Sequence, residues 1–129
     1  MNPPAGPGPS GVEGRRQQAA ELGRVAGVVA ALGVCGLWMV FVFWNPYDTR
    51  IEPPTMLLGS TMILAAALAG AAAARKAHLA MYLLFIVSFF PVGFYVMLGP
   101  GIFQAIGWLE LTYLASAVLV HLGVVRETR

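Results

Sequence analysis

Four long apolar runs dominate this chain and leave few folds open to it. They cover residues 25–44, 56–74, 79–98 and 102–125, which is 20, 19, 20 and 24 residues. Each run matches the roughly 20 helical residues that cross about 30 Å of hydrocarbon. None of them has the polar face that a helix on the surface of a soluble bundle needs. The sequence therefore predicts an all-α membrane protein with four transmembrane helices.

Composition supports the same fold class. Of the 129 residues, 58% are hydrophobic and 11% are charged, whereas a soluble domain carries roughly 25% charged residues. So few charges cannot cover a water-facing surface, and the expected partner is the lipid bilayer. The formal net charge of +2 lies in short patches without a basic reading face, so nucleic acid is not predicted as a partner.

The first 16 residues differ from the rest of the chain. Residues 1–16 are rich in Pro and Gly and contain almost nothing to bury, which is typical of a disordered tail. We therefore predict a Pro/Gly-rich cytoplasmic tail over 1–16 and one four-helix transmembrane domain over 17–129.

Basic residues orient the predicted spans. The 45–55 connection contains Arg50, and the other side holds Arg15, Arg16, Arg24, Arg75, Lys76, Arg126 and Arg129. Because cytoplasmic segments are enriched in Lys and Arg, both termini and the middle connection are predicted to be cytoplasmic. The expected location is the inner (plasma) membrane of a prokaryote-type cell, with the chain crossing it several times.

The connection between the last two spans is very short. Only Gly-Pro-Gly at 99–101 separates them, so these helices must form an antiparallel hairpin. Residues whose numbers sum to about 200 should then lie at one depth, and the four helices should form an antiparallel bundle.

Small residues at steps of four indicate where helices approach closely. One series is Gly23, Gly27 and Ala31, and the other is Ala66, Gly70 and Ala74. They could form a docking surface for a partner or a second copy. Ordinary packing inside the four-helix unit is the favoured interpretation.

Glu110 is an acidic residue within the last apolar run. At about 1.5 Å per residue it lies about 12 Å in from Ile102, where an ionised side chain costs about 2.5–3.5 kcal/mol. Such a group usually faces the bundle interior and finds a partner, or stays protonated. We therefore expect an inward-facing carboxylic acid that is neutral for much of the time.

The hairpin register suggests a partner for this acid. Glu110 should lie level with Phe90 and Pro91. Since proline donates no backbone hydrogen bond, the Val87 carbonyl is left free to accept one from Glu110, with Ser88 as a competing group. On a helical wheel the inward-facing stripe consists of Phe103, Gly107, Glu110, Tyr113, Ala117 and His121.

Two roles fit that stripe. The favoured one is structural or accessory: Glu110, Val87, Ser88, Pro91 and Tyr113 form a polar clip, in a protein that is a homo-oligomer or a subunit of a larger membrane complex. The alternative is a small proton-coupled transporter or proton relay that uses Glu110. No nucleophile–base arrangement indicates an enzyme.

The two histidines allow one further hypothesis. His78 and His121 sum to 199, which places them at one depth near the cytoplasmic boundary. Facing histidines can bind haem or a metal, but helices packed about 8–10 Å apart leave little room for a haem, and a metal would need further ligands. No cofactor or metal is therefore predicted.

Overall fold

The computed structural model describes residues 2–4, 6, 11–47 and 50–124. Its elements are α1 (Gly11–Trp44), α2 (Pro53–Ala74), α3 (His78–Ser88), the π-helical segment η1 (Phe89–Gly93), α4 (Phe94–Met97) and α5 (Ile102–Val124). The described part of the chain contains no strand. Four helical units are long and apolar enough to cross a membrane: α1, α2, α3 through α4, and α5. The predicted fold class is confirmed.

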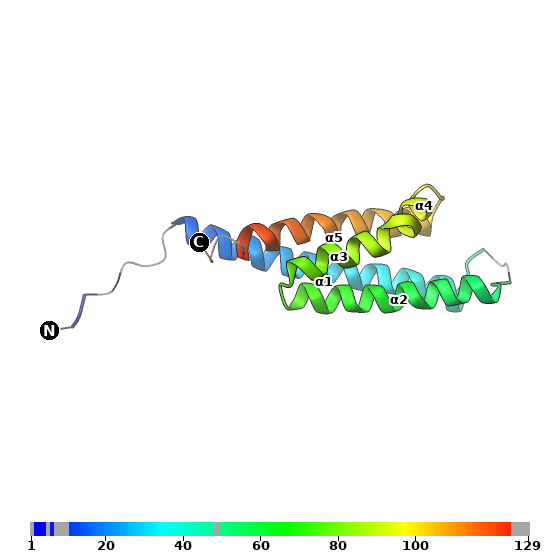
Figure 1. Ribbon diagram of the computed structural model, residues 1–129, viewed down its shortest axis with the longest axis horizontal. Coiled ribbons are helices and arrows are strands. Elements are labelled where there is room, and N and C mark those ends of the chain that lie inside the picture. Colours follow the sequence, from blue (N-terminus) through cyan, green and yellow to red (C-terminus); the bar gives the residue numbers. More distant parts are fainter. Residues whose placement is uncertain (1, 5, 7–10, 48–49, 125–129) are drawn as a thin grey trace.

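The helices form an antiparallel bundle (Figure 1). Helix α1 packs against α2 and α5, and α3 packs against the same two helices. Gly59 of α2 lies against Val42 near the end of α1, whereas Gly27 lies against Ala73 at the other end. We call the half that carries both termini the terminal half, and the half near the α1–α2 and α4–α5 connections the distal half.

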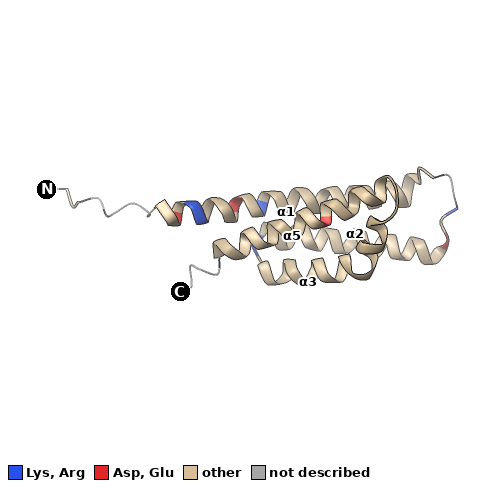
Figure 2. Ribbon diagram, turned by 90° about the horizontal axis from the view of Figure 1, so that it is seen from above, with Lys and Arg blue, Asp and Glu red and all other residues tan. Residues whose placement is uncertain are grey.

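Charged residues lie mostly outside the apolar body of the bundle. Figure 2 shows most of the described Lys, Arg and Glu residues on the overhanging first part of α1 and in the connections. Glu21 pairs there with Arg24, at 3.0 Å from its Nε, and with Lys76 in the turn between α2 and α3. Predicted basic residues Arg126 and Arg129, and residue 125 of the last predicted span, lie outside the described residues.

Helix α1 begins at Gly11, so residues 11–16 of the predicted tail are helical. The reason is tertiary packing against the last turn of α5. A Cβ on Gly123 would lie 2.5 Å from the Ala20 Cβ and 3.0 Å from the Arg16 carbonyl oxygen. Ala20 is 5% exposed. A glycine on α5 therefore lets the early turns of α1 dock, which the local composition of 11–16 does not reveal.

The third span is broken near its middle, where the sequence predicts one continuous helix over 79–98. The α-helix ends at Ser88, the next five residues are π-helical, and Phe90 has a non-helical backbone (φ −108°, ψ 123°). Pro91 accounts for the break because it lacks an N–H and its ring clashes with an α-helical turn. Past the break, η1 and α4 pack against α5, while α3 leans away from α2 (Figure 1).

Two buried clusters form the core on either side of this break. The cluster of the terminal half contains Ala30, Ala31, Ala72, Ala73, Met81, Phe85, Phe89, Tyr113, Ala117 and Val120. The cluster of the distal half contains Val34, Trp38, Met62, Ala66 and Ile106. Alanines dominate the first cluster, so the helices approach closely there, whereas larger side chains fill the second.

Candidate functional site

Glu110 lies inside the bundle and is 4% exposed. It belongs to the buried face of α5, together with Gly107, Tyr113 and Ala117. Phe103 and His121, the ends of the predicted stripe, are half-buried. The structure therefore places this carboxyl group away from surrounding lipid.

The carboxyl group packs against the backbone of η1 at Gly93. A Cβ built on Gly93 would overlap the Glu110 carboxyl and would lie 3.1 Å from the Ser88 carbonyl oxygen. Glycine at this position therefore makes the room that the acid occupies. The hairpin register had predicted a neighbour at Phe90 or Pro91. The contact falls three residues beyond Phe90, and a similar offset occurs nearer the turn, where a Cβ on Gly107 would meet Met97 of α4.

Neither carboxyl oxygen of Glu110 forms a hydrogen bond with any residue that the structure describes. The expected bond to the Val87 carbonyl is therefore not formed, and the Val87 side chain is 60% exposed. Ser88 is within interaction range of the carboxyl group, but its Oγ donates to the Phe85 carbonyl oxygen at 3.3 Å. The break at η1 explains why the predicted bond is absent. The prediction assumed a continuous α-helix in which Pro91 leaves only the Val87 carbonyl without a donor, and the backbone there is not a continuous α-helix.

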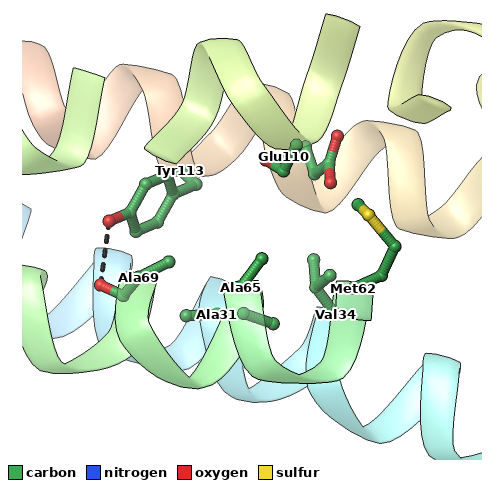
Figure 3. Close-up of a pocket in the computed structure, with 9 residues that line it drawn as sticks. Ala31, Val34, Met62, Ala65, Ala69, Glu110 and Tyr113 are labelled. Atoms are coloured by element: carbon green, nitrogen blue, oxygen red, sulfur yellow. Dashed lines mark hydrogen bonds between the residues drawn. The ribbon is translucent and has the colours of Figure 1, made fainter. Parts of the chain in front are cut away.

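A small cavity lies beside Glu110 (Figure 3). Its volume is about 20 Å³, and its polar lining residues are Glu110, Ser88 and Tyr113. The remaining wall comes from small and apolar side chains of α1 and α2, including Ala31, Val34 and Met62. A single water needs a cavity volume of about 10–15 Å³, so the space fits one water-sized group.

Tyr113 joins two helices that face each other across the bundle. Its hydroxyl donates to the Ala69 carbonyl oxygen of α2 at 2.8 Å, the dashed line in Figure 3. The ring is 4% exposed. Among the residues predicted for the polar clip, Tyr113 thus forms an interhelical bond, although with α2 and not with α3.

The predicted packing residues lie at different places in the bundle. A Cβ on Gly27 would lie 2.8 Å from Ser116 Oγ and 2.9 Å from the Ala73 Cβ, and one on Gly23 would lie 2.8 Å from the Ser116 carbonyl oxygen. Ala31 and Ala66 are buried, and a Cβ on Gly70 would meet Ala31 at 3.6 Å. Ala74 is exposed. Most of these residues therefore pack helices within this chain.

The histidines contact each other, as their predicted common depth requires. The His78 and His121 rings lie edge to face with centroids 4.9 Å apart, and Tyr82 adds a second edge contact to His121 at 5.8 Å. Among the described residues, no three His, Cys, Asp or Glu side chains lie close enough together to hold a metal ion. The arrangement is thus an aromatic cluster between α3 and α5.

Sequence reasoning missed a groove in the distal half. Its volume is about 570 Å³, and it lies between α2 and the η1–α4 segment. Trp38, Phe41, Phe94 and Phe103 supply aromatic rings to its wall, and no charged residue lines it. Pro91 was the available signal, because a kink there separates the later part of the span from α2.

These observations define a class of protein: a small α-helical membrane protein with four spans and, in the part of the chain that the structure describes, one buried acid beside a broken helix. Comparison with protein-family models, curated proteins and solved structures finds no match for this chain. The candidate site must therefore be interpreted from its own geometry.

Proposed function

We propose that this chain is an accessory membrane protein, which works as a homo-oligomer or as a subunit of a larger complex in the plasma membrane with both termini in the cytoplasm. The observation that carries this role is the small size of the cavity beside Glu110. The cavity there is about 20 Å³, which is room for about one water. A transported solute larger than water would find no space at the acid.

Close helix packing in the terminal half supports the same role. Gly23 and Gly27 bring α1 against α5, and Gly27 also meets Ala73 of α2. Ala30, Ala73 and Ala117 are at most 1% exposed. Interfaces of small residues hold membrane helices by close van der Waals contact, so opening a passage there would cost much of the packing that stabilises the bundle.

The outer faces of the helices offer apolar surface for assembly. Leu57 on α2, Leu79 on α3 and Leu98 after α4 are 72%, 73% and 74% exposed. Lipid chains can cover these side chains, and so can the helices of a partner. An accessory subunit would use one such face for a partner and leave the others in lipid.

A second candidate, proton relay, is favoured by one observation. Both Glu110 oxygens are buried without a hydrogen-bond partner among the described residues. A polar clip would satisfy them, whereas a proton-carrying acid needs a group that can gain and lose a proton. Intramembrane acids of this kind commonly mark proton pathways.

Site-specific photocrosslinking in native membranes tests the accessory role. A photoreactive residue is placed in turn at Leu57 on α2, Leu79 on α3 and Leu98 in the turn after α4. We expect one face to give an adduct of a single defined mass and the others to give lipid adducts only. Lipid adducts from all three positions would contradict the accessory role.

Proton flux into liposomes distinguishes the proton relay from the accessory role. Wild type and Glu110→Gln are reconstituted and exposed to a pH gradient. An accessory protein gives no flux in either form, while a relay gives flux that the substitution abolishes. Thr112→Val, an exposed position on the same helix, is the matched control.

A further inference from the structure

The apolar groove and the Glu110 cavity are stacked along the same seam of the bundle. Three segments beside the seam each give one residue to the groove and, four positions away, another to the cavity, while α5 gives Phe103 to the groove and Glu110 to the cavity. The three pairs four positions apart are Trp38 and Val34 on α1, Leu58 and Met62 on α2, and Val92 and Ser88 on η1 and α3. Four residues make about one helical turn, or about 5.4 Å. The cavity therefore lies about one turn deeper than the inner end of the groove.

The two spaces differ in size and chemistry. The groove holds about 570 Å³ behind an apolar and aromatic wall. The cavity holds about 20 Å³ and ends at the Glu110 carboxyl group, which is 4% exposed and has no hydrogen-bond partner among the described residues. Together they suit a ligand with a sizeable apolar body and one small polar head.

Met62 lines the cavity and lies one helical turn along α2 from Leu58 of the groove wall. It is 5% exposed and belongs to the buried cluster of the distal half. Figure 3 shows its side chain beside the Glu110 carboxyl. Methionine is unbranched and has three rotatable side-chain bonds, so it adapts to irregular spaces. A ligand reaching from the groove to the cavity would pass the turn of α2 that carries Leu58 and Met62.

We infer that this seam binds a lipophilic primary amine, with its apolar body in the groove and its nitrogen at Glu110. Charge complementarity selects this occupant over a neutral lipid chain. No Lys, Arg or His lines either space, so a basic ligand would meet an acid with no competing cation. The cavity also limits the head to about the size of a water, which an amino group satisfies.

The proton count balances without another reactant. The amine enters from the membrane in its neutral form, and Glu110 begins as the neutral acid that a low-dielectric site favours. The carboxyl O–H bond breaks, and its proton forms the new N–H bond of an ammonium group. The result is one ammonium–carboxylate pair of zero net charge, so no unpaired charge enters the bundle. Aromatic rings near the groove suit the apolar body of such a ligand.

Fluorescence quenching in lipid nanodiscs tests this binding. Trp44 and Trp108, which are 81% and 57% exposed, are replaced by phenylalanine so that Trp38 in the groove wall reports alone. The probes are a brominated alkylamine and the brominated alkyl alcohol of the same chain length. We expect the amine to quench Trp38 at about tenfold lower membrane concentration than the alcohol, a difference of about 1.4 kcal/mol.

Glu110→Gln should bring the two quenching curves together, while Ser60→Ala on the exposed face of α2 should leave them apart. Met62→Ile, whose branched side chain turns less freely, should slow the amine's association and spare that of the alcohol. Circular dichroism checks that each variant keeps its helices. Equal quenching by both probes in the Trp38 reporter, or an amine preference that survives Glu110→Gln, would overturn the inference. The crosslinking result for the accessory role is independent of either outcome.

Discussion

At the terminal half of the bundle, alanines and glycines let four helices approach closely, whereas at the distal half α2 stands apart from η1 and α4. In the first region Ala73 and Ala117 are fully buried, and a Cβ on Gly27 would press on two helices. In the second, larger side chains such as Trp38 and Met62 form the core, and a groove of about 570 Å³ lies open beside them. One bundle thus combines a tightly packed half with a half that contains an open apolar groove.

The broken helix accounts for this difference. Up to Ser88, α3 packs against both α2 and α5. Beyond it, η1 and α4 pack mainly against α5, because Pro91 prevents the α-helix from continuing on its original course. Membrane helices gain little from generic hydrophobic contact with each other, so the lost packing against α2 has a small energetic cost. Glu110 lies at this boundary.

The largest expected effect tests the tightly packed end. Gly27→Leu should destabilise the bundle by about 3 kcal/mol or more, because its side chain has no space between α5 and α2. The matched variant Gly36→Leu, on the same helix with nothing within 4 Å of its Cβ position, should leave stability nearly unchanged. Denaturant unfolding followed by circular dichroism measures both. Equal losses in the two variants would refute the packing difference.

The contact between Glu110 and η1, where the two halves of the bundle meet, is tested by Gly93→Ala. Its new methyl group would overlap the Glu110 carboxyl, and we expect a loss of about 2 kcal/mol. In a Glu110→Ala background the same change should cost much less, so the double mutant should lose less stability than the sum of the two single variants. Gly70→Ala, where the new Cβ would meet Ala31 at an ordinary 3.6 Å, serves as the control. Additive losses of stability would show that position 93 and Glu110 do not interact.

A smaller effect is expected where α5 is tied to α2. Tyr113→Phe removes the hydroxyl that donates to the Ala69 carbonyl at 2.8 Å. Interhelical hydrogen bonds in membranes are worth about 0.6 kcal/mol on average and about 1.7 at most, so the loss should be about 1 kcal/mol. Tyr95→Phe at a 78% exposed position provides the comparison. Measuring the free energy of unfolding of both variants tests whether the Tyr113 hydroxyl stabilises the bundle.

The smallest effect belongs to the charged cluster outside the apolar body. The hydrogen bond from Lys76, and after it the positive charge of Arg24, lowers the pKa of Glu21 below its ordinary 4.5. Its stabilising contribution is therefore full above pH 4.5 and is lost as the pH falls through the lowered value. Because the group is exposed, the change in unfolding midpoint should be slight and sensitive to salt. Glu21→Gln should remove this pH dependence, and its persistence would assign it to another acid.

Much of the fold could be predicted because it depends on patterns that survive in any environment. Four apolar runs of sufficient length imply four spans, and a three-residue turn implies a hairpin. The same reasoning brought His78 to His121 and turned Glu110 toward the interior. Each of these follows from helix period and membrane thickness, which a single sequence contains.

The local details at Glu110 could not be predicted in the same way. Assigning the Val87 carbonyl as its partner assumed a continuous helix with one missing bond. The backbone instead rearranged over five residues, and Gly93 became the neighbour of the acid. How a chain relieves a proline depends on the helices packed around it, so the position of each carbonyl is a property of the whole bundle.

Length, apolarity and the spacing of small residues by themselves determined a four-helix membrane bundle with one acid facing inward. Only the tertiary structure decided that α1 starts at Gly11, that Glu110 contacts the η1 backbone, and that a groove lies between α2 and the η1–α4 segment. The physical reason is that the periodicity of a helix is local, while docking partners, helix breaks and cavities depend on side chains far apart in the chain meeting at one place.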